Sequence, residues 1–274
     1  MIFKADLHCH SIFSDGTDDP EKLIYQAVQS GLLGLSITDH DTIAAYPAAI
    51  DYARKHRLLL LPGVEFSAAY QGVSVHVLGY AFALHSQKLH QLCDQHRHRR
   101  VNRNRNILKK LKKLGMSIEE EEIKTQSKVI GRPHIAQIMV QKGFVSSIKE
   151  AFDHYLGEKK EAYDPGEPIS IMETIETIHA AYGLAVIAHP HLIKQQSIIK
   201  YLLELPFDGI EAYYARFKPA QEKPWIEIGN EKKWINTGGS DYHGKIKPFH
   251  FLGSSWVDKN TFDQLYAHYL ISNS

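Results

Sequence analysis

The N-terminal stretch DLHCHSIFSDG, residues 6–16, carries the strongest structural signal in this chain. His8 and His10 are two residues apart, and side chains with this spacing in an extended strand point to the same face. Both imidazoles can therefore reach one point, which suggests a metal ion, and Asp15 follows closely enough to add a carboxylate. Cys9 lies between the two histidines, and we expect it to point the other way as a small buried residue.

Length and composition fit a globular enzyme-sized domain. The chain has 274 residues, a length at which an α/β barrel forms a single unit with room for one insertion. Its hydrophobic content of 43% and charged content of 23% are ordinary, and its formal net charge of +1 excludes a general attraction to polyanions. The 17 histidines are unusual and again indicate metal chemistry.

The sequence predicts a cytoplasmic protein without a membrane association or an obligate protein partner. MIFKADLH, residues 1–8, lacks the basic stretch and the long apolar run of a secretory signal, and no apolar run elsewhere is long enough to span a bilayer. Cys9 and Cys93 are far apart, so they indicate neither a disulfide framework nor a paired-cysteine zinc site.

Short apolar runs alternate with helical patterns along most of the chain. Asp19 and Pro20 open a predicted helix that ends at Gly31, and the apolar run at residues 32–38 follows as a buried strand. Further strands are predicted at residues 58–67, 73–82, 183–189, 208–213, 233–241 and 253–257. Helices are predicted at about residues 42–55, 169–182, 198–203 and 219–229, and from residue 261. This alternation favours parallel strands with helical crossovers, numerous enough to close a barrel.

The alternation stops between about residues 84 and 167. We therefore predict a barrel formed by residues 1–83 and 168–274, and a mostly helical cap domain formed by residues 84–167. The cap carries nine Lys and Arg residues from Arg97 to Lys113, followed by an acidic run from Glu119 to Glu122. A long insertion that leaves a barrel at one strand end commonly lies over the mouth.

Nearly every predicted strand ends in a polar group, and barrel enzymes gather their reactive side chains at the C-terminal ends of the strands. A single histidine beside a strand is usually a hydrogen-bonded core or surface residue. Many imidazoles and carboxylates at one mouth would be costly to desolvate without cations, so the set predicts a site for several metal ions. The groups are Asp6, His8, His10, Asp15, Asp39, His40, Glu65, His76, His189, Glu211, Asp241 and His243.

The motifs HCH with the trailing SDG, then TDHD, GVE, a strand histidine, AHP and SDYH resemble the PHP family, named for polymerase and histidinol phosphatase. They occur in this order over nearly the whole chain, and the resemblance implies a distorted (β/α)7 barrel with two or three divalent ions. No ligand position is missing, which favours an active enzyme over the degenerate members attached to replicative polymerases. The family's nine ligand positions fall on His8, His10, Asp15, His40, Glu65, His76, His189, Asp241 and His243.

We expect these ligands to divide into three sets. Mixed imidazole and carboxylate ligands suit Mn²⁺, Fe²⁺ or Zn²⁺ better than Mg²⁺, and Mn²⁺ is the first expectation. Asp6 and Asp39 are expected to orient imidazole rings from outside the cluster. The expected sets are His8, His10 and Asp241 for one ion, Glu65 bridging from it to a second ion held by His76 and His189, and Asp15, His40 and His243 for a third.

Phosphoester hydrolysis follows from such a ligand set. Clustered cations stabilise the charge on a phosphoryl group and lower the pKa of bound water, so a metal-bound hydroxide would be the nucleophile. Free-standing members of the family are phosphoesterases, and carbon–nitrogen hydrolysis, as in the related amidohydrolases, is a weaker hypothesis. We expect Glu65, His189 and Asp241 to be catalytic residues as well as ligands.

The cap resembles one subgroup of the family more closely, through GRPHIAQIMVQKGF at residues 131–144, EAFDHYLG and EAYDPGEP. Members of that subgroup act as nucleoside 3′,5′-bisphosphate phosphatases and as 5′-to-3′ exonucleases on short RNA. Arg132 could clamp a second, non-reacting phosphate, and His134 could join it as a substrate-binding residue or protonate a leaving oxygen as a catalytic one. Alternatively, Arg132 is a surface salt-bridge partner and His134 lies in the first turn of a helix after Pro133.

The basic stretch at residues 96–115 supports two interpretations. Its charges could be the solvated face of an amphipathic helix, or they could guide RNA or a nucleotide toward the mouth. Tyr163 and Phe144 could stack a base, although core packing is the commoner role of such residues. The apolar residues that recur at helical spacing are Val101, Leu108, Leu111 and Leu114.

Three functions therefore compete. The first is a metal-dependent phosphoesterase that releases phosphate from nucleoside 3′,5′-bisphosphates, as from pAp to AMP, or removes nucleotides from the 5′ end of short 5′-phosphorylated RNA. The second is a histidinol-phosphate phosphatase, which leaves the basic stretch and the GRPH segment without a purpose. The third is a nucleic-acid-binding or polymerase-accessory module with structural metals, and the complete ligand set argues against it.

Overall fold

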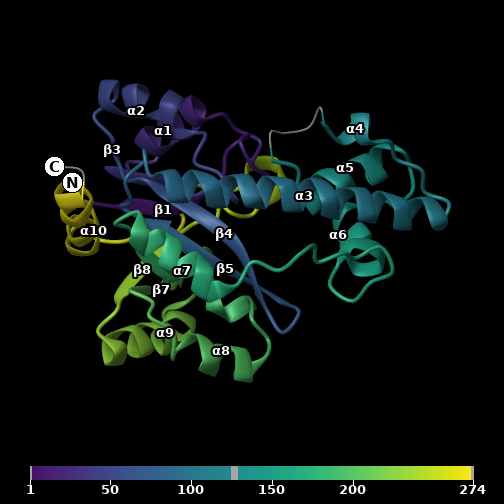
Figure 1. Ribbon diagram of the computed structural model, residues 1–274. Coiled ribbons are helices and arrows are strands. Elements are labelled where there is room, and N and C mark those ends of the chain that lie inside the picture. The colour runs from purple at the N-terminus through teal and green to yellow at the C-terminus, as the bar shows by residue number, and fades with distance from the viewer. Residues whose placement is uncertain (1, 125–128, 273–274) are drawn as a thin grey trace.

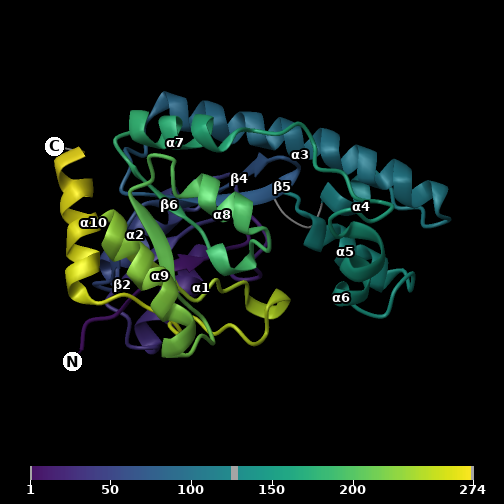
Figure 2. The same cartoon turned by 90° about the horizontal axis from the view of Figure 1, so that it is seen from below.

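The computed structural model describes residues 2–124 and 129–272, and it consists of an α/β body from which a long helix extends. Figure 1 shows the strands in the middle of the body, the extended helix α3 (Gln87–Lys113) running away from it, and smaller helices at its far end. Figure 2 shows that α10 (Lys259–Ser272) and both chain termini lie at the opposite end of the molecule. Within the described residues, no helix combines the length and the apolar character needed to cross a membrane.

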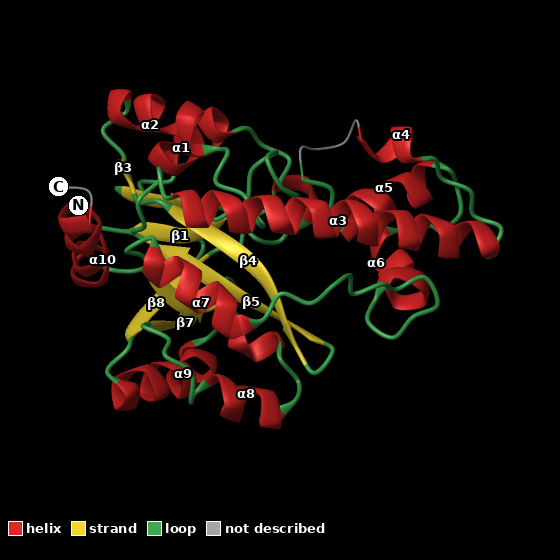
Figure 3. Cartoon of the chain, in the orientation of Figure 1, coloured by secondary structure: helices red, strands yellow, loops and turns green. Residues whose placement is uncertain are grey.

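Two sheets form the body (Figure 3). The strands of the first sheet are parallel. Two backbone hydrogen bonds join this sheet to the second sheet: Asp241 N donates to His8 O at 2.7 Å, and His10 N donates to Tyr242 O at 2.8 Å. At the opposite edge of the first sheet, the backbone of His40, just after the second strand of that sheet, forms a parallel β-bridge with Glu65 of the second sheet. The strands thus follow a ring in the order β3, β2, β1, β8, β7, β6, β5, β4, which confirms the α/β class. The first sheet contains β1 (Ala5–Cys9), β2 (Gly34–Ile37) and β3 (Leu59–Leu60), and the second β4 (Gly63–Tyr70), β5 (Val73–Tyr80), β6 (Leu184–Ile187), β7 (Gly209–Tyr214) and β8 (Ile235–Gly239).

The structure differs from the predicted series of parallel strands in two places. β5 runs antiparallel to both β4 and β6. Gln71 and Gly72, with φ of 50° and 77°, form a tight hairpin turn between β4 and β5, whereas the expected series was parallel. Alternating burial does not encode strand direction, so the pattern at residues 73–82 could not reveal this. The predicted last strand, residues 253–257, is also wrong, since only Val257 forms a bridge, with Ala5.

Helices cover the outside of the ring. The Asp19 side chain caps α1 (Pro20–Gln29) by accepting a hydrogen bond from Lys22 N at 2.8 Å, as the sequence predicts for a helix start. Cys9 is fully buried in the core beneath this helix, which confirms its expected orientation. The remaining helices of the body are α2 (Tyr46–Lys55), α7 (Ile171–Ala180), α8 (Gln196–Leu202) and α9 (Pro219–Lys232).

α3 belongs to two hydrophobic cores. Leu89 and Leu92 in its first turns pack into the core of the body, whereas Ile107 and Leu111 pack with the far helices in a separate core. The two cores agree with a cap that has an interior of its own, but the exact division at residues 84 and 167 stays a prediction. The far helices are α4 (Glu120–Lys124), α5 (Arg132–Gln141), α6 (Ile148–Ala151) and a π-helical turn at Phe152–Leu156.

Candidate metal centre

The structure brings all nine predicted ligands into one continuous cluster. Each lies within 4 Å of at least one other across an imidazole–carboxylate pair, although they come from six separate segments of the chain. The segments are the β1 end with its loop, the β2 end, β4, β5, the β6 end and the β8 end. Parallel strands whose C-terminal ends meet at one rim of the ring bring together the ligands after β1, β2, β6 and β8. Glu65 and His76 come instead from within the antiparallel pair β4 and β5.

Glu65 lies at the centre of the cluster. Its Oε2 is 3.2 Å from His8 Nε2, His10 Nε2 and His40 Nδ1. Its Oε1 is 2.7 Å from His76 Nδ1 and 2.8 Å from His189 Nε2. The two oxygens of one carboxylate therefore contact two different groups of imidazoles, which is the geometry that a bridging ligand requires.

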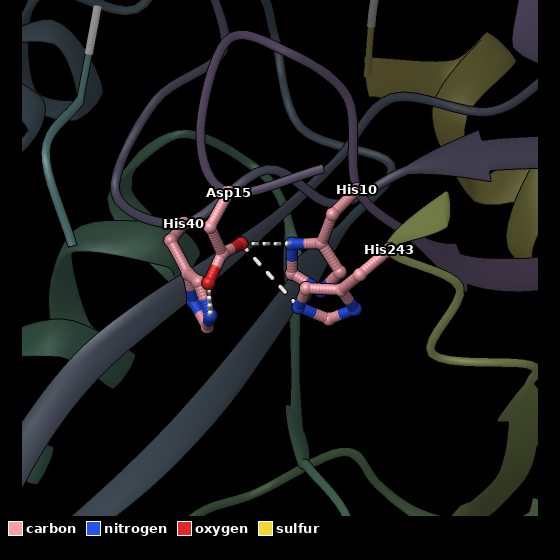
Figure 4. A group of neighbouring side chains, drawn as sticks. All are labelled: His10, Asp15, His40 and His243. Carbon is pink, nitrogen blue, oxygen red and sulfur yellow. Dashed lines mark ion pairs between the residues drawn. The ribbon is translucent and has the colours of Figure 1, made fainter. Parts of the chain in front are cut away.

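Asp15 gathers a further group of imidazoles (Figure 4). Its carboxylate lies 3.3 Å from His243 Nε2 and 3.7 Å from both His10 Nδ1 and His40 Nε2. Figure 4 shows the carboxylate between the ring of His40 and the rings of His10 and His243. Asp241 closes the cluster, with Oδ1 at 3.5 Å from His8 Nε2 and 3.4 Å from His10 Nε2.

These residues fit divalent metal ions. Ligand atoms at ~2.1 Å from a shared ion lie roughly 3.0–3.4 Å from one another, and the contacts around Glu65 Oε2 fall in this range. The buried His40 Nδ1 makes no hydrogen bond within the described part of the chain although it faces Glu65, which suits a nitrogen directed at a cation. Three groups have ligand atoms close enough to hold an ion: His10 with Asp15, His40 and His243; His8 with His10 and Glu65; and His40 with Glu65 and His76.

These groups overlap the three expected ligand sets without reproducing them. His40 falls into two groups, and His189 falls into none of them within the described chain, although its Nε2 lies close to Glu65 Oε1. The division of ligands among ions therefore stays a prediction.

The pKa values of two carboxylates and one imidazole of the cluster suit metal ligation. Burial alone would raise the pKa of Glu65, but the imidazoles of His40, His76 and His8 outweigh burial and hold this pKa well below its usual range. The pKa of Asp15 is low for the same reason, because His40 and His243 outweigh burial. Burial lowers the pKa of His40 to about 3, so this ring is neutral, the form that ligates metals.

Glu211 is a supporting residue that the sequence marked as a strand-end acid but gave no role. Its Oε1 lies 2.7 Å from His8 Nδ1, and its Oε2 accepts a hydrogen bond from His189 N at 2.6 Å. A carboxylate at His8 Nδ1 favours the tautomer with its proton on that nitrogen and leaves Nε2 free to face the cluster. Glu211 therefore positions two of the predicted ligands.

Tyr214 and Lys247 were missed entirely. Both donate hydrogen bonds to Asp241 Oδ2, Tyr214 Oη at 2.5 Å and Lys247 Nζ at 2.6 Å. Lys247 lies in an irregular loop with no sequence pattern that relates it to Asp241. Only the fold reveals this contact.

Asp6 and Asp39 brace loops instead of imidazole rings, so their expected role is corrected. Asp39 accepts hydrogen bonds from Ser11 N at 2.7 Å and from Ser14 Oγ at 2.6 Å. Asp6 accepts from the backbone N–H groups of Ser240 and Gly253. Backbone amides next to these strand ends need acceptors, and the two carboxylates supply them.

A cationic cavity of about 170 Å³ adjoins the cluster. Asp15, His40 and His76 form its floor, and its walls come largely from the cap. The Arg132 guanidinium stacks 5.2 Å from the centre of the Tyr163 ring and donates a hydrogen bond to Leu156 O at 3.2 Å. Its contacts are therefore not those of the surface salt bridge that was the alternative. The arginines that line the cavity are Arg99, Arg100, Arg103 and Arg132.

The positive charge in this cavity is only partly balanced. Arg100 Nε donates to Asp41 Oδ2 at 2.6 Å. Arg103 is buried, yet its described hydrogen bonds go to Asn104 Oδ1 and Ile130 O. Burial and the neighbouring guanidinium groups of Arg100 and Arg132 lower the Arg103 pKa well below its usual value. Such a group favours an anionic ligand.

His134 lies in the first turn of α5 and is buried. Its Nδ1 accepts a hydrogen bond from Gly131 N at 2.9 Å, which caps the helix, and the ring is not among the residues that line the cavity. A substrate-binding or acid role for His134 stays a prediction. Of the two candidate stacking residues, Tyr163 lines the cavity, whereas Phe144 packs against the cap core.

An α/β ring with a cluster of imidazoles and carboxylates at its rim and arginines beside it defines a metal-dependent phosphoesterase. The chain belongs to the PHP family, since the PHP domain model matches residues 6–163. The family and the names of its phosphoesterase relatives indicate a metal-dependent hydrolase.

Three curated relatives show the range of chemistry. The chain is 38% identical to a 5′-3′ exoribonuclease of Haemophilus influenzae, over 69% of this chain and 70% of that protein. It is 28% identical to a phosphoribosyl 1,2-cyclic phosphate 1,2-diphosphodiesterase of Eggerthella lenta, over 88% and 94%. It is 29% identical to a 3′,5′-nucleoside bisphosphate phosphatase of Chromobacterium violaceum, over 68% and 66%.

Solved structures agree with the fold. The crystal structure of a candidate metal-dependent phosphoesterase from Bifidobacterium adolescentis superposes with a TM-score of 0.87 at 30% identity, covering 96% of each chain.

Proposed function

We propose that this protein hydrolyses a phosphoester in nucleotides that carry a second phosphate on the 5′ side, namely nucleoside 3′,5′-bisphosphates and short 5′-phosphorylated RNA. The observation that carries the proposal is the arginine cavity next to the metal cluster. A substrate with two phosphates can place one at the cluster and the other among guanidinium groups, whereas a simple phosphomonoester uses only the first.

The residues of the chain divide the work. Glu65, Asp15 and Asp241 with the six histidines would hold two or three divalent ions, for which we propose Mn²⁺. Bound there, such ions supply positive charge for the phosphoryl group and lower the pKa of water. Glu65 and Asp241 would fix the ion positions, and His189 would contact the phosphoryl group. Glu211 and the Asp39 loop hold these side chains in place.

Arg132 and Arg103 would bind the second phosphate. Arg132 is oriented by Tyr163 and Leu156 O, so its guanidinium reaches the cavity in one preferred position. Arg103 contributes a buried charge without a described carboxylate partner. The relatives named 5′-3′ exoribonuclease and 3′,5′-nucleoside bisphosphate phosphatase support this choice, since an RNA chain and a nucleoside bisphosphate both carry more than one phosphate.

The proposal is tested by a substrate panel assayed with Mn²⁺. The panel contains adenosine 3′,5′-bisphosphate, a 5′-phosphorylated oligoribonucleotide, its 5′-hydroxyl counterpart, histidinol phosphate and phosphoribosyl 1,2-cyclic phosphate. We expect kcat/KM to be highest for the first two and to fall when the 5′ phosphate is absent. A preference for histidinol phosphate or for the cyclic diester would reject the proposed substrate class.

A further inference from the structure

The loops that follow β6, β7 and β8 form a surface of aromatic and basic side chains next to the metal centre. We propose that this surface, formed by His191, Arg216, Phe217 and Phe249, binds the nucleotide on the 3′ side of the scissile phosphate in an RNA substrate by stacking its base. The inference rests on the proposed function, and it concerns a part of the substrate that a mononucleotide lacks.

The position of the surface follows from the order of the strands. The arginine cavity lies over residues of β4 and β5 and the end of β2, through Ser67, Ser74 and His40. The aromatic surface lies over the ends of β6, β7 and β8. These are different arcs of the ring, and the metal cluster lies between them.

Close ring contacts connect the aromatic surface to the cluster. The His191 ring centre is 6.5 Å from that of His189, 4.4 Å from that of Tyr214 and 4.5 Å from that of Phe217. Tyr214 in turn donates a hydrogen bond from its hydroxyl group to Asp241 Oδ2. A group bound on this surface is therefore adjacent to the phosphate at the cluster.

The chemistry of the surface suits a nucleobase and its phosphate. Phe249 is 68% exposed, which is unusual for so large an apolar side chain, and the Arg216 guanidinium lies 5.7 Å from the centre of its ring. Exposed aromatic rings combined with basic groups are the features that bind single-stranded nucleic acid without sequence preference. Lys218 is also exposed nearby in sequence and adds positive charge.

The polarity of the RNA fixes which nucleotide reaches this surface. With the 5′ phosphate among the arginines and the scissile phosphate at the cluster, the first nucleoside spans the distance between them. The remaining chain on the 3′ side must leave away from the arginine cavity, toward the loops after β6, β7 and β8. A nucleoside bisphosphate ends at the cluster and makes no contact beyond it.

The test compares kcat/KM for a 5′-phosphorylated trinucleotide with kcat/KM for adenosine 3′,5′-bisphosphate, using the Mn²⁺-loaded full chain. In Phe249→Ala we expect the ratio of the two values to fall roughly tenfold, because stacking on one aromatic side chain is lost. Phe249→Trp should restore the ratio. Tyr182→Ala is the matched control, since Tyr182 is equally exposed at 68% but precedes β6 at the opposite end of the strand.

The outcomes separate the inference from the function on which it rests. If the parent protein hydrolyses both substrates but Phe249→Ala leaves the ratio unchanged, or lowers both values equally, the inference is overturned. It is also overturned if Asn102→Ala and Asn106→Ala lower the ratio instead, since these residues line a polar groove along α3. If the parent hydrolyses neither substrate, the proposed function itself fails.

Discussion

The metal cluster and the arginine cavity adjoin each other but are built in opposite ways. The cluster combines three carboxylates and six imidazoles from six segments, held by strands that hydrogen-bond to one another. The cavity takes three of its four arginines from the single helix α3 and the fourth from α5. The first therefore depends on the whole ring, and the second depends on how the cap docks against it.

The two regions also need opposite charges. Cations would stabilise the buried carboxylates of the cluster, and an anion would stabilise the buried guanidinium groups of the cavity. We therefore expect the cluster to determine the reaction and the cavity to determine the choice of substrate. The following variants separate these two roles.

Glu65→Ala should have the largest effect, because the two carboxylate oxygens of Glu65 reach both groups of imidazoles. We expect the loss of at least one bound ion and a fall in kcat of more than about 1,000-fold on every substrate. Metal content by mass spectrometry and steady-state kinetics measure these changes. A Glu65→Ala protein with full metal content and full activity would exclude the bridging role.

Arg132→Ala should affect only substrates with two phosphates. We expect kcat/KM for adenosine 3′,5′-bisphosphate to fall about 50-fold, the value of a lost hydrogen-bonded charge pair, while a simple phosphomonoester changes little. Arg97→Ala is the control, since Arg97 is an arginine of α3 that does not line the cavity and pairs with Asp94 in solvent. Equal losses on both substrates would remove Arg132 from phosphate binding.

Glu211→Gln should weaken metal binding without changing substrate choice. Its carboxylate holds His8 Nδ1, so we expect the metal dissociation constant to rise about tenfold while the ratio of kcat/KM values between substrates stays constant. Titration with Mn²⁺ measures the constant. Glu204→Gln serves as a control because Glu204 is 80% exposed. An unchanged metal affinity would show that the contact to His8 does not position the ligand.

Replacing His96 should give the smallest effect, a change in how the free energy of unfolding depends on pH. His96 lies where α3 packs against the body. Its ring stacks on Phe66, Nδ1 lies 3.2 Å from Asp41 Oδ1, and the facing cations are Arg100 and Arg99. Burial lowers the His96 pKa to about 4; Asp41 opposes this shift, and Arg100 and Arg99 add to it.

Because the folded pKa lies below the unfolded value of ~6.5, the unfolded chain binds the proton first and stability falls from about pH 6.5 toward pH 4. From pH 7 to pH 6 the loss is about 0.7 kcal/mol. Urea unfolding with EDTA present should show that His96→Leu lacks this loss. The same pH slope in both proteins would contradict the assignment to His96.

The sequence predicted the cluster far better than its surroundings. Ligand residues follow short apolar runs in motifs such as HCH and SDYH, so residue type, spacing and strand position together identified His8, His10 and Asp241. The sequence also identified α/β alternation, but the direction of β5 depends on the turn at Gln71 and Gly72, which a period of two residues does not report.

The sequence predicted the basic helix that lines the arginine cavity but not which of its arginines are buried. A basic helix that carries an apolar stripe predicts a solvated charged face, and Leu108 and Leu111 are indeed buried. Arg100 and Arg103 are buried as well, because they turn toward the body and the segment near Ile130. Which side of a long helix faces a cavity depends on the docking of the cap, a tertiary contact that local spacing does not encode.

The most direct test of the account is anomalous diffraction at the manganese edge from crystals of the Mn²⁺-loaded protein. We expect at least two peaks that share Glu65 as a ligand, one beside His8 and His10 and the other beside His76 and His189. A single peak that does not contact Glu65, or peaks outside the cluster in a protein that still hydrolyses phosphoesters, would contradict it.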